Sequence, residues 1–268
     1  MNNNFKLISQ PNLLFKKIFT KIKKKPFKSN INGVIFNFDF TLDAALKEMY
    51  CGTYEQETVS LIKSILKNGD TFIDIGANIG YISALALGLV GNTGKVYSFE
   101  PVPRFFDRLV SLKQDNLNLN FFPNQLALGD KKTDSTISIS HHPNIGWNTM
   151  VPGLMKQETI KETFDINTIR LDEYIFKNSI NNITLIKIDT EGYEFPVLLG
   201  LLEYFSKYKE RPKIICEIVP NAYSLLGYTL KDLKEYMTNC GYKAYSISSN
   251  NLMNIEDIQD TTNILFMA

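Results

Sequence analysis

Strand-like and helix-like segments alternate through most of the sequence from residue 71 onwards. The first strand-like runs are TFIDI (71–75) and KVYSFE (95–100), and a helical pattern follows each of them. This alternation predicts a parallel sheet with helices on both faces, because parallel neighbours need a long crossover connection. The last two strand-like runs, YKAYSIS and TNILFMA, are joined by a polar loop, so we expect an antiparallel hairpin at one sheet edge. The predicted fold class is α/β, with a doubly wound and mostly parallel sheet.

The composition is that of an ordinary globular protein. Of the 268 residues, 44% are hydrophobic and 21% are charged, which is enough for one domain with a buried core. No apolar run approaches the ~20 residues that a membrane span needs, and no signal peptide is evident. The three cysteines, Cys51, Cys216 and Cys240, are widely spaced. They predict reduced thiols in a cytoplasmic protein, not disulfides or a zinc site.

Basic residues are concentrated at the N-terminus. Residues 1–28 carry eight lysines and no acidic residue, which leaves 21 basic and 28 acidic residues for the rest of the chain. This acidic remainder excludes nucleic-acid binding by bulk charge. Within residues 12–25, Leu14, Ile18 and Ile22 lie four apart among lysines. The pattern predicts an amphipathic helix that can lie on the inner face of an anionic membrane; a solvated tail or a helix packed on the body is the alternative.

The first strand-like run leads into a turn that contains glycine. In FIDIGANIGY, Asp74 stands at the end of the strand, and Gly76 and Gly80 flank a tight turn into the next helix. Ligands bind beyond the strand ends of such sheets, where glycine lets the backbone approach them closely. The pattern is D-x-G-x-x-x-G and not G-x-G-x-x-G. An acidic side chain at this position disfavours a pyrophosphate and suits a ligand with a positively charged end, such as the amino group of a methionine moiety.

A second acidic residue follows the next strand-like run. Glu100 comes directly after VYSF, and an acid about twenty residues beyond a glycine turn commonly accepts hydrogen bonds from ribose hydroxyls. The alternative is a structural turn in which Glu100 caps the helix that begins after Pro101. Because the glycine turn and the acid occur together, the cofactor interpretation is favoured.

Several segments together resemble the FkbM-type family of class I methyltransferases, which use S-adenosylmethionine. They are GDTFIDIGANIGY, VYSFEPVPRFFDRL, LALGD, TIRLDEYI and LIKIDTEGYEFPVLLG. The glycine turn is shared by all class I methyltransferases, whereas IKIDTEGYE with the following VLLG is much more specific to this family. The resemblance implies a seven-stranded sheet that ends in an antiparallel hairpin, which agrees with the pattern at the C-terminus.

The resemblance also implies which residues bind the cofactor. The methionine and ribose side is assigned to Asp74, Gly76, Ala77, Asn78 and Gly80, the ribose to Glu100 and the adenine to Gln125. Tyr54 and Glu55 precede the first motif at a spacing that is typical of the family. Neither the residues nor the resemblance gives these two a role.

Charged residues cluster in IKIDTEGYE (186–194), where the fourth strand of the sheet meets a helix. Methyl transfer to a hydroxyl requires a group that positions the nucleophile and removes its proton. Asp189 ends a strand that lies beside the first one in this sheet order, so we predict that it acts near the methyl group as base or orienting residue. Glu191 and Glu194 either raise one another's pKa for catalysis or cap the helix. Lys187 is expected to pair with an acid.

Two further groups of residues are alternatives for this chemistry. Asp189 and Glu217 end adjacent strands and have oxygen ligands that suit magnesium, but nothing fixes the number of ligands, so no metal is predicted. Residues 141–165 interrupt the alternation, and we expect them to close over the cleft and recognise the acceptor. Within them, His141 and His142 are each an alternative base or an exposed loop residue.

The sequence thus predicts an S-adenosylmethionine-dependent O-methyltransferase, and the resemblance makes a sugar or glycan hydroxyl the expected acceptor. Residues 1–30 are expected to form the basic tail and residues 31–268 the methyltransferase domain. An N- or RNA-methyltransferase is one alternative, but DTEG stands where DPPY or NPPY is usual in such enzymes. A non-catalytic module of a glycan-synthesis complex is another, and the intact cofactor motifs argue against it.

Overall fold

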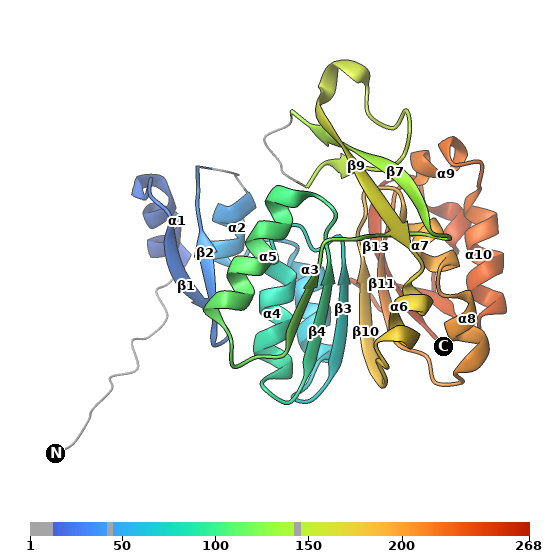
Figure 1. Ribbon diagram of the computed structural model, residues 1–268, viewed down its shortest axis with the longest axis horizontal. Helices are drawn as coiled ribbons and strands as arrows, with labels where there is room; N and C mark the ends of the chain where they lie inside the picture. The colour runs from blue at the N-terminus through green and yellow to red at the C-terminus, as the bar shows by residue number, and fades with distance from the viewer. Residues whose placement is uncertain (1–12, 42–44, 142–145) are drawn as a thin grey trace.

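The computed structural model describes residues 13–41, 45–141 and 146–268. Within these ranges a seven-stranded sheet forms the centre of the molecule, with strand order β12-β13-β11-β10-β3-β4-β5 (Figure 1). Its strands are β3 (Thr71–Ile75), β4 (Lys95–Phe99), β5 (Phe121–Asn124), β10 (Ile183–Ile188), β11 (Lys213–Ile218), β12 (Lys243–Ser246) and β13 (Thr262–Met267). The pairings from β5 to β11 are parallel, whereas β13 is antiparallel to both β11 and β12. The predicted fold class and the C-terminal antiparallel hairpin are therefore confirmed.

Helices cover both faces of this sheet. They include α3 (Gln56–Ile65), α4 (Tyr81–Val90), α5 (Pro103–Asp115), α6 (Leu171–Lys177), α7 (Glu194–Leu199), α8 (Leu202–Lys207), α9 (Pro220–Leu225) and α10 (Leu230–Asn239). Successive strand residues point to opposite faces, so Phe72 joins the core with α3, α4 and α5, while Ile73 joins the core with α6 to α10. Because both faces are buried, the strands are almost entirely apolar. Charged side chains inside them are exceptions that mark the site.

Two segments that look like single elements in the sequence are each divided. NFFPNQLAL contains β5 and also β6 (Ala127–Leu128), which pairs with a strand of another sheet. FPVLLGLLEYFSKY contains two helices, α7 and α8. The chain turns between them at Gly200, where a Cβ would lie 2.2 Å from the carbonyl oxygen of Gly129. Each of these two segments therefore contains two elements of secondary structure.

A second sheet stands above one end of the central sheet (Figure 1). Its strand order is β6-β9-β7-β8, with β7 (Thr133–Ser140), β8 (Asn148–Thr149) and β9 (Ile160–Ile169). Strands β7 and β9 form a long antiparallel hairpin. We call residues 133–141 and 146–169 the flap. Within the interrupting region 141–165, the described residues 146–165 contribute β8 and the first part of β9 to the flap.

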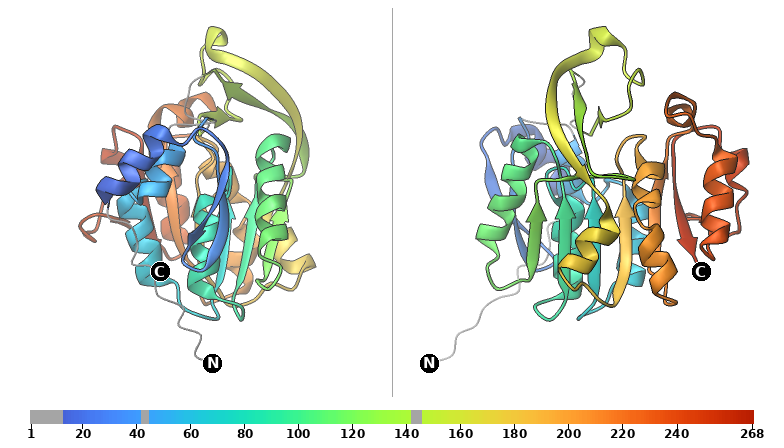
Figure 2. Two further views of the ribbon diagram at one scale, coloured as in Figure 1. Left: turned by 90° about the vertical axis from the view of Figure 1, so that its left-hand side faces the viewer. Right: turned by 45° about the vertical axis from the view of Figure 1, so that its right-hand side comes forward.

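The N-terminal elements pack beside the central sheet. An antiparallel hairpin of β1 (Phe27–Ile31) and β2 (Val34–Phe38) lies against α4 and α5 (Figure 2, left, blue). Helix α1 (Leu13–Ile22) packs on α2 (Ala45–Cys51). The ring of Phe19 in α1 lies 5.2 Å from that of Phe27 and 5.5 Å from that of Tyr50. The ordered hairpin therefore begins inside the range that was expected to be a tail.

The other side of α1 faces solvent. Leu14 is 68% exposed and Ile18 is 52% exposed, and the exposed lysines Lys17 and Lys21 lie on the same side of the helix. The predicted amphipathic basic helix is present. Among the described residues, no helix combines the length and apolar character that crossing a bilayer requires. All three cysteines are free thiols, as expected.

Candidate active site

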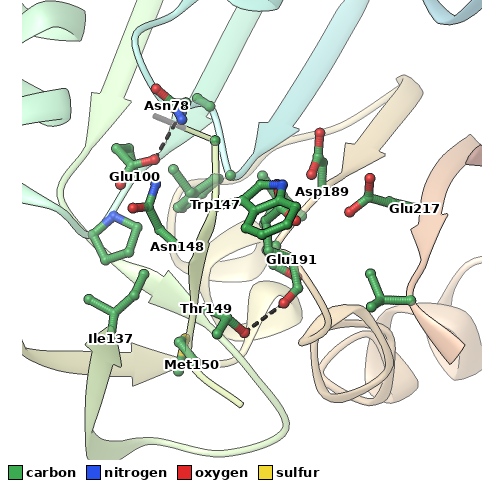
Figure 3. A pocket seen from close by; sticks show the side chains of 18 of the residues that line it. Asn78, Glu100, Ile137, Trp147, Asn148, Thr149, Met150, Asp189, Glu191 and Glu217 are labelled. Carbon is green, nitrogen blue, oxygen red and sulfur yellow. Dashed lines mark hydrogen bonds between the residues drawn. The ribbon is translucent and has the colours of Figure 1, made fainter. Parts of the chain in front are cut away.

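A cavity of about 830 Å³ opens between the flap and the carboxyl ends of the central strands (Figure 3). Its volume falls in the range of ligand pockets, roughly 300–1,000 Å³. The predicted site residues that line it are Asp74, Gly76, Ala77, Asn78, Glu100, Asp189 and Glu191. Three others that the structure describes, Gly80, Gln125 and Glu194, lie outside the lining. The glycine turn, Glu100 and the acidic residues after β10 therefore meet in one cavity.

Strand register brings the charged residues of the cavity to one face of the sheet. Lys187 of β10 lies opposite Asp74 of β3 and opposite Ile215 of β11. Asp189, directly after β10, is two residues beyond Lys187, and Glu217 in β11 is two residues beyond Ile215, so both point to the same face. Figure 3 shows the side chains of Asp189 and Glu217 next to each other at the cavity. Period-two alternation in three neighbouring strands thus builds the charged wall of the site.

Asp74 is buried at the end of β3 with one of its oxygens occupied. Its Oδ2 accepts a hydrogen bond from Ser83 Oγ at 2.5 Å, whereas its Oδ1 has no hydrogen-bond partner in the described part of the chain. Burial raises the pKa of Asp74 to about 6, and the charge of Lys187 opposes this rise. Asp74 lines the cavity, and a buried carboxylate oxygen without a partner suits a positively charged donor.

The two glycines of the turn are required by packing. Both have positive φ, 77° at Gly76 and 85° at Gly80. A Cβ at Gly76 would lie 1.7 Å from the carbonyl oxygen of Asp189, and one at Gly80 would lie 2.6 Å from Cδ2 of Leu109. Gly76 therefore lets the cofactor turn lie directly against the end of β10. This close approach puts the glycine turn and the acidic residues after β10 side by side.

Glu100 connects the glycine turn to the start of α5. Its Oε2 accepts a hydrogen bond from the amide of Asn78 at 2.9 Å (Figure 3). Its Oε1 accepts one from the amide of Val102 at 2.8 Å. Burial raises the pKa of Glu100 to about 7, while these two amides work in the opposite direction. The carboxylate thus satisfies amides of the turn and of the helix start while it also lines the cavity.

Asp189 forms a partly buried ion pair with Lys187. Lys187 Nζ lies 2.6 Å from Asp189 Oδ2, and the two side chains are 3% and 18% exposed. Burial disfavours the ammonium, but the negative charges of Asp189, Glu55 and Asp74 outweigh it and raise the pKa of Lys187. The predicted pairing of Lys187 with an acid is confirmed. Because Asp189 keeps some exposure and lines the cavity, its carboxylate is accessible to a ligand.

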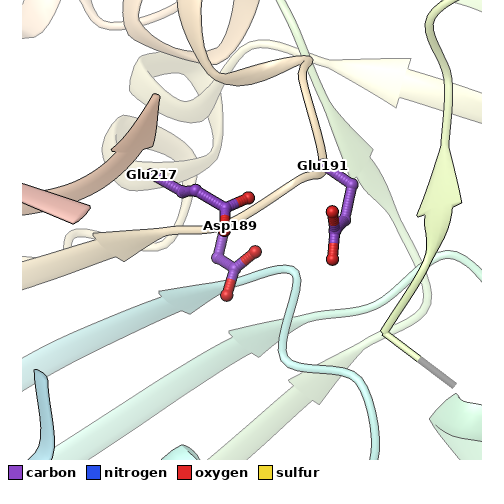
Figure 4. Close-up of side chains that lie close together, drawn as sticks. All are labelled: Asp189, Glu191 and Glu217. Atoms are coloured by element: carbon purple, nitrogen blue, oxygen red, sulfur yellow. The ribbon is translucent and has the colours of Figure 1, made fainter. Parts of the chain in front are cut away.

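Three carboxylates converge beside this ion pair. One oxygen from each of Asp189, Glu191 and Glu217 lies within 4.8 Å of the others (Figure 4). Burial, reinforced by the neighbouring carboxylates, raises the pKa of Glu191 to about 9 and that of Glu217 to about 11. Like charges this close cannot all be ionised, so the cluster holds protons or a cation at neutral pH. Its all-oxygen ligand set is of the kind that magnesium binds.

Glu194 lies behind this cluster and supports its backbone. The side chain is completely buried. Its Oε1 accepts hydrogen bonds from the amide of Thr190 at 2.9 Å, the hydroxyl of Thr190 at 3.0 Å and the amide of Gly192 at 2.9 Å. These bonds hold the turn that carries Glu191, which has a left-handed φ of 52°. The contacts favour the structural alternative for Glu194, and they separate it from Glu191.

Comparison with known proteins identifies the family of this chain. Residues 74–244, more than half of the chain, match the model of the methyltransferase FkbM domain. The chain belongs to the FkbM methyltransferase family. The predicted membership of the FkbM-type methyltransferase family is therefore confirmed. The match begins at Asp74, so α1 to α3 and the β1–β2 hairpin precede the FkbM domain itself.

The alignments with similar proteins cover only part of each of those proteins. The hexuronic acid methyltransferase AglP of Haloferax volcanii is 29% identical over 148 residues, which are 55% of this chain and 56% of that protein. The chain thus spans about half the length of the curated relative it matches. The methyltransferase FkbM from Methylobacillus flagellatus KT aligns over 83% of this chain and 54% of its own, with 19% identity and a TM-score of 0.47. Fibrillarin from Aeropyrum pernix aligns over 79% of this chain and 73% of its own, with 11% identity and a TM-score of 0.44.

The flap of this FkbM-family protein supplies residues that the sequence motifs missed. Trp147, Asn148, Thr149 and Met150 line the cavity (Figure 3). Thr149 Oγ1 donates a hydrogen bond to the carbonyl oxygen of Glu191 at 2.6 Å, which ties the flap to the acidic cluster. Trp147 is 51% exposed. It is the only tryptophan in the chain, and this was the one feature of the sequence that pointed to a role for this segment.

The histidines that were considered as alternative bases are not found in the cavity lining of the described structure. His141 is exposed and is absent from the cavity lining, and His142 lies outside the described residues. Met49 and Ala45 of α2 line the cavity although their segment carries no motif. Neither histidine is therefore placed at the acidic cluster by the described part of the structure.

The raised pKa values of the FkbM site predict how stability depends on pH. Glu191 titrates near 9 in the folded state against an ordinary 4.5, so the folded protein binds more protons than the unfolded chain between these values. Stability must then fall as pH rises. We expect the unfolding temperature, measured by calorimetry without added ligand, to decrease from pH 5 to pH 9.

Replacement of the acid gives the control for this prediction. Glu191→Gln should make the decrease shallower, because a neutral side chain takes the place of the titrating one. Glu57→Gln, an exposed acid in the first turn of α3, should leave the slope unchanged. A wild-type unfolding temperature that is flat or rises over this pH range would contradict the account of the cluster.

Proposed function

We propose that this protein transfers the methyl group of S-adenosylmethionine to a hydroxyl of a sugar or glycan. One observation carries the proposal: the cavity that contains the cofactor turn and Glu100 also contains accessible Asp189 and its carboxylate cluster. The cofactor's sulfonium and the group that prepares the acceptor would therefore lie side by side. Geometry of this kind, in which two reactants are held together, is a main source of rate enhancement.

Asp189 has the contacts of a residue that orients and deprotonates a hydroxyl. Its Oδ2 is held by Lys187, which fixes the carboxylate and leaves the second oxygen for the acceptor. In the proposed reaction the acceptor oxygen attacks the methyl carbon, the carbon–sulfur bond breaks with its electrons going to sulfur, and the hydroxyl proton passes to the carboxylate. The products are a methyl ether and S-adenosylhomocysteine. Glu191 and Glu217 are the nearby groups that can share this proton.

A hydroxyl of a sugar fits the walls of the cavity. An acceptor carboxylate at the reacting position would face Asp189, Glu191 and Glu217, and like charges would repel it. The half-exposed ring of Trp147 offers a face on which the apolar side of a sugar ring can pack. The name of the Haloferax relative, a hexuronic acid methyltransferase, supports a sugar acceptor.

Both alternative functions have less support. An RNA substrate needs a basic surface, but the chain beyond residue 28 has seven more acidic than basic residues. A non-catalytic module would not require a cavity in which buried carboxylates remain without partners. Residues 146–165 supply part of the flap and several of them line the cavity. We propose that the region 141–165 contacts the acceptor.

The test is an acceptor screen with methyl-labelled S-adenosylmethionine. Methyl glucuronoside, methyl glucoside and a short RNA would be incubated with the full-length protein, in parallel with and without EDTA. We expect label in a sugar. Activity that EDTA abolishes and Mg²⁺ restores would assign a metal to Asp189, Glu191 and Glu217, whereas unchanged activity would leave proton transfer to the carboxylates alone. Label only in RNA, or none in any sugar, would contradict the proposal.

Helix α1 is proposed to rest on an anionic membrane surface. Its outer side presents Leu14 and Ile18 with exposed lysines around them, a pairing that fits acyl chains and lipid phosphates. Its inner side is fixed to α2, since Phe19 contacts Tyr50 and the adjacent Met49 lines the cavity. Docking of α1 would therefore bring the cavity close to an acceptor that is held at the membrane.

Vesicle sedimentation checks this docking. The protein is expected to bind vesicles that contain phosphatidylglycerol more tightly than vesicles of phosphatidylcholine alone, and salt should weaken the binding. The double variant Leu14→Ser, Ile18→Ser should lose at least about tenfold in affinity, because two apolar side chains no longer enter the bilayer. Leu117→Ser, which changes an 80% exposed leucine elsewhere, is the matched control. Equal binding to both kinds of vesicle would remove the proposal.

A further inference from the structure

The peptide group between Glu191 and Gly192 is held at both ends by side chains. Its carbonyl oxygen, on Glu191, accepts a hydrogen bond from Thr149 Oγ1 at 2.6 Å (Figure 3). Its N–H, on Gly192, donates a hydrogen bond to Glu194 Oε1 at 2.9 Å. Rotation of this peptide plane would break both bonds and leave a backbone donor and a backbone acceptor unsatisfied. The flap and the helix α7 side of the turn therefore fix the peptide group together.

This fixed peptide group supports an unfavourable backbone conformation. Glu191 has φ of 52° and Gly192 has φ of 105°. Positive φ is easy for glycine but disfavoured for glutamate, whose Cβ meets the backbone, so it persists only where the surrounding contacts require it. If one of the two bonds were lost, the turn could relax and Glu191 could return to negative φ. The direction of its side chain would change with the backbone.

Thr149 is well placed to give this support from the flap. It ends β8 and is buried, and its Oγ1 accepts a hydrogen bond from the amide of Val151 at 3.1 Å. Because the hydroxyl accepts from Val151, its own proton is free to point at Glu191. The flap also packs directly on the turn: a Cβ at Gly192 would lie 3.0 Å from Cδ2 of Leu154 and 3.2 Å from Cγ2 of Val151.

We propose that Thr149 is a positioning residue, which holds Glu191 so that its carboxylate stays with those of Asp189 and Glu217. One oxygen of each of the three carboxylates lies within 4.8 Å of the others. Like charges at this separation favour movement of an ionised Glu191 out of the cluster, and a fixed backbone resists that movement. The consequence for turnover rests on the proposed function, in which Glu191 shares the proton of the acceptor hydroxyl.

Replacements of Thr149 test the positioning on the full-length protein without added ligand. Thr149→Val keeps the shape of the side chain but loses the hydroxyl, and Thr149→Ser keeps the hydroxyl. We expect the unfolding temperature of Thr149→Val to decrease from pH 5 to pH 9 as little as that of Glu191→Gln, because a released Glu191 regains a pKa near 4.5. Thr149→Ser should keep the wild-type slope. The other charged groups around Glu191 are unchanged in both variants; they are Asp189, Lys187, Glu194, Glu55 and Glu217.

Thr168→Val is the matched control. Thr168 is also a buried threonine of the flap, and its Oγ1 donates to the carbonyl oxygens of Lys131 at 2.9 Å and Thr133 at 3.1 Å. It is absent from the cavity lining. This variant should unfold at a lower temperature at every pH, with the wild-type slope. A purely structural role of Thr149 predicts the same behaviour for Thr149→Val. If valine prevents folding at position 149, Thr149→Ala, which lets water reach the carbonyl, is measured in its place.

Steady-state kinetics of sugar methylation give a second readout. Thr149→Val is expected to lower kcat by about 10- to 100-fold, the usual effect of a displaced catalytic group, with KM for S-adenosylmethionine within about twofold of wild type. Thr149→Ser should recover most of this loss. In the Glu191→Gln background, the addition of Thr149→Val should change kcat by less than about twofold, since a residue that acts through Glu191 has no further effect once Glu191 is replaced.

The outcomes separate this inference from the proposed function. If wild-type protein methylates no sugar, the proposed function fails, and the pH slopes alone decide the inference. A wild-type slope in Thr149→Val overturns it. A loss of kcat that is equally large with and without Glu191→Gln also overturns it, because Thr149 would then act on the ligand directly. A shallow slope in Thr149→Val that Thr149→Ser restores and Thr168→Val does not reproduce supports it.

Discussion

Asp189→Asn is expected to lower kcat for sugar methylation by about 10²- to 10⁴-fold, the usual contribution of a positioned acid or base. Asparagine keeps the shape of the side chain but cannot accept the hydroxyl proton. Binding of S-adenosylhomocysteine should stay within about threefold of wild type, since the cofactor motifs in the turn after β3 are untouched. Single-turnover kinetics with labelled cofactor, together with calorimetry, measure the two effects separately.

A surface variant controls for the loss of an ion pair. Asp115→Asn removes a lysine–aspartate pair with Lys28 that has a similar length, 2.7 Å against 2.6 Å for the pair in the cavity. Its turnover should equal that of wild type. If Asp189→Asn retained more than about a tenth of wild-type turnover, or lost cofactor binding in proportion to turnover, the assignment of Asp189 to the acceptor would be wrong.

Gly76→Ala is expected to destabilise the fold by more than ~4 kcal/mol, which is exceptional for a single substitution. The added Cβ would lie 1.7 Å from the carbonyl oxygen of Asp189, so the turn and the end of β10 could not keep their positions. Positive φ alone accounts for only part of the loss. Urea unfolding followed by circular dichroism gives the free energy of unfolding.

Gly52→Ala is the matched control for this substitution. Gly52 has φ of 75°, against 77° at Gly76, and a Cβ there would meet nothing within 4 Å. We expect a loss of roughly 1–2 kcal/mol, the cost of left-handed backbone without a clash. Equal losses for the two variants would show that the contact between the cofactor turn and Asp189 is not tight.

The central sheet and the position of the glycine turn after β3 could be predicted because their signals are local. Strand–helix alternation and the glycine turn are each contained in a few consecutive residues, and the resemblance to FkbM proteins placed Asp189 next to them. Glu191 and Glu194 could not be separated in the same way. Both follow Asp189 closely in the chain, and only the three hydrogen bonds to Glu194 show that it supports the turn.

The flap and the cavity-lining residues before α3, Tyr54 and Glu55, could not be predicted from such local signals. Strand β9 alternates between exposed and more buried positions, but Glu162 and Thr168 are among its inward-facing residues, so the apolar alternation by which a strand is recognised is interrupted. Glu55 is an ordinary acid at a helix start when it is considered in the sequence, and its place in the cavity lining is a property of the folded chain.

The most direct test of the account is the chemistry of the product. Wild-type protein, labelled S-adenosylmethionine and methyl glucuronoside would be incubated, and the product treated with alkali, which releases a methyl ester but leaves a methyl ether intact. The proposed role of the acidic cluster predicts an alkali-stable methyl ether, formed in equal amount to S-adenosylhomocysteine and nearly absent with Asp189→Asn. Alkali-labile label, formed equally well by Asp189→Asn, would show that a carboxylate is the acceptor and would contradict the central claim.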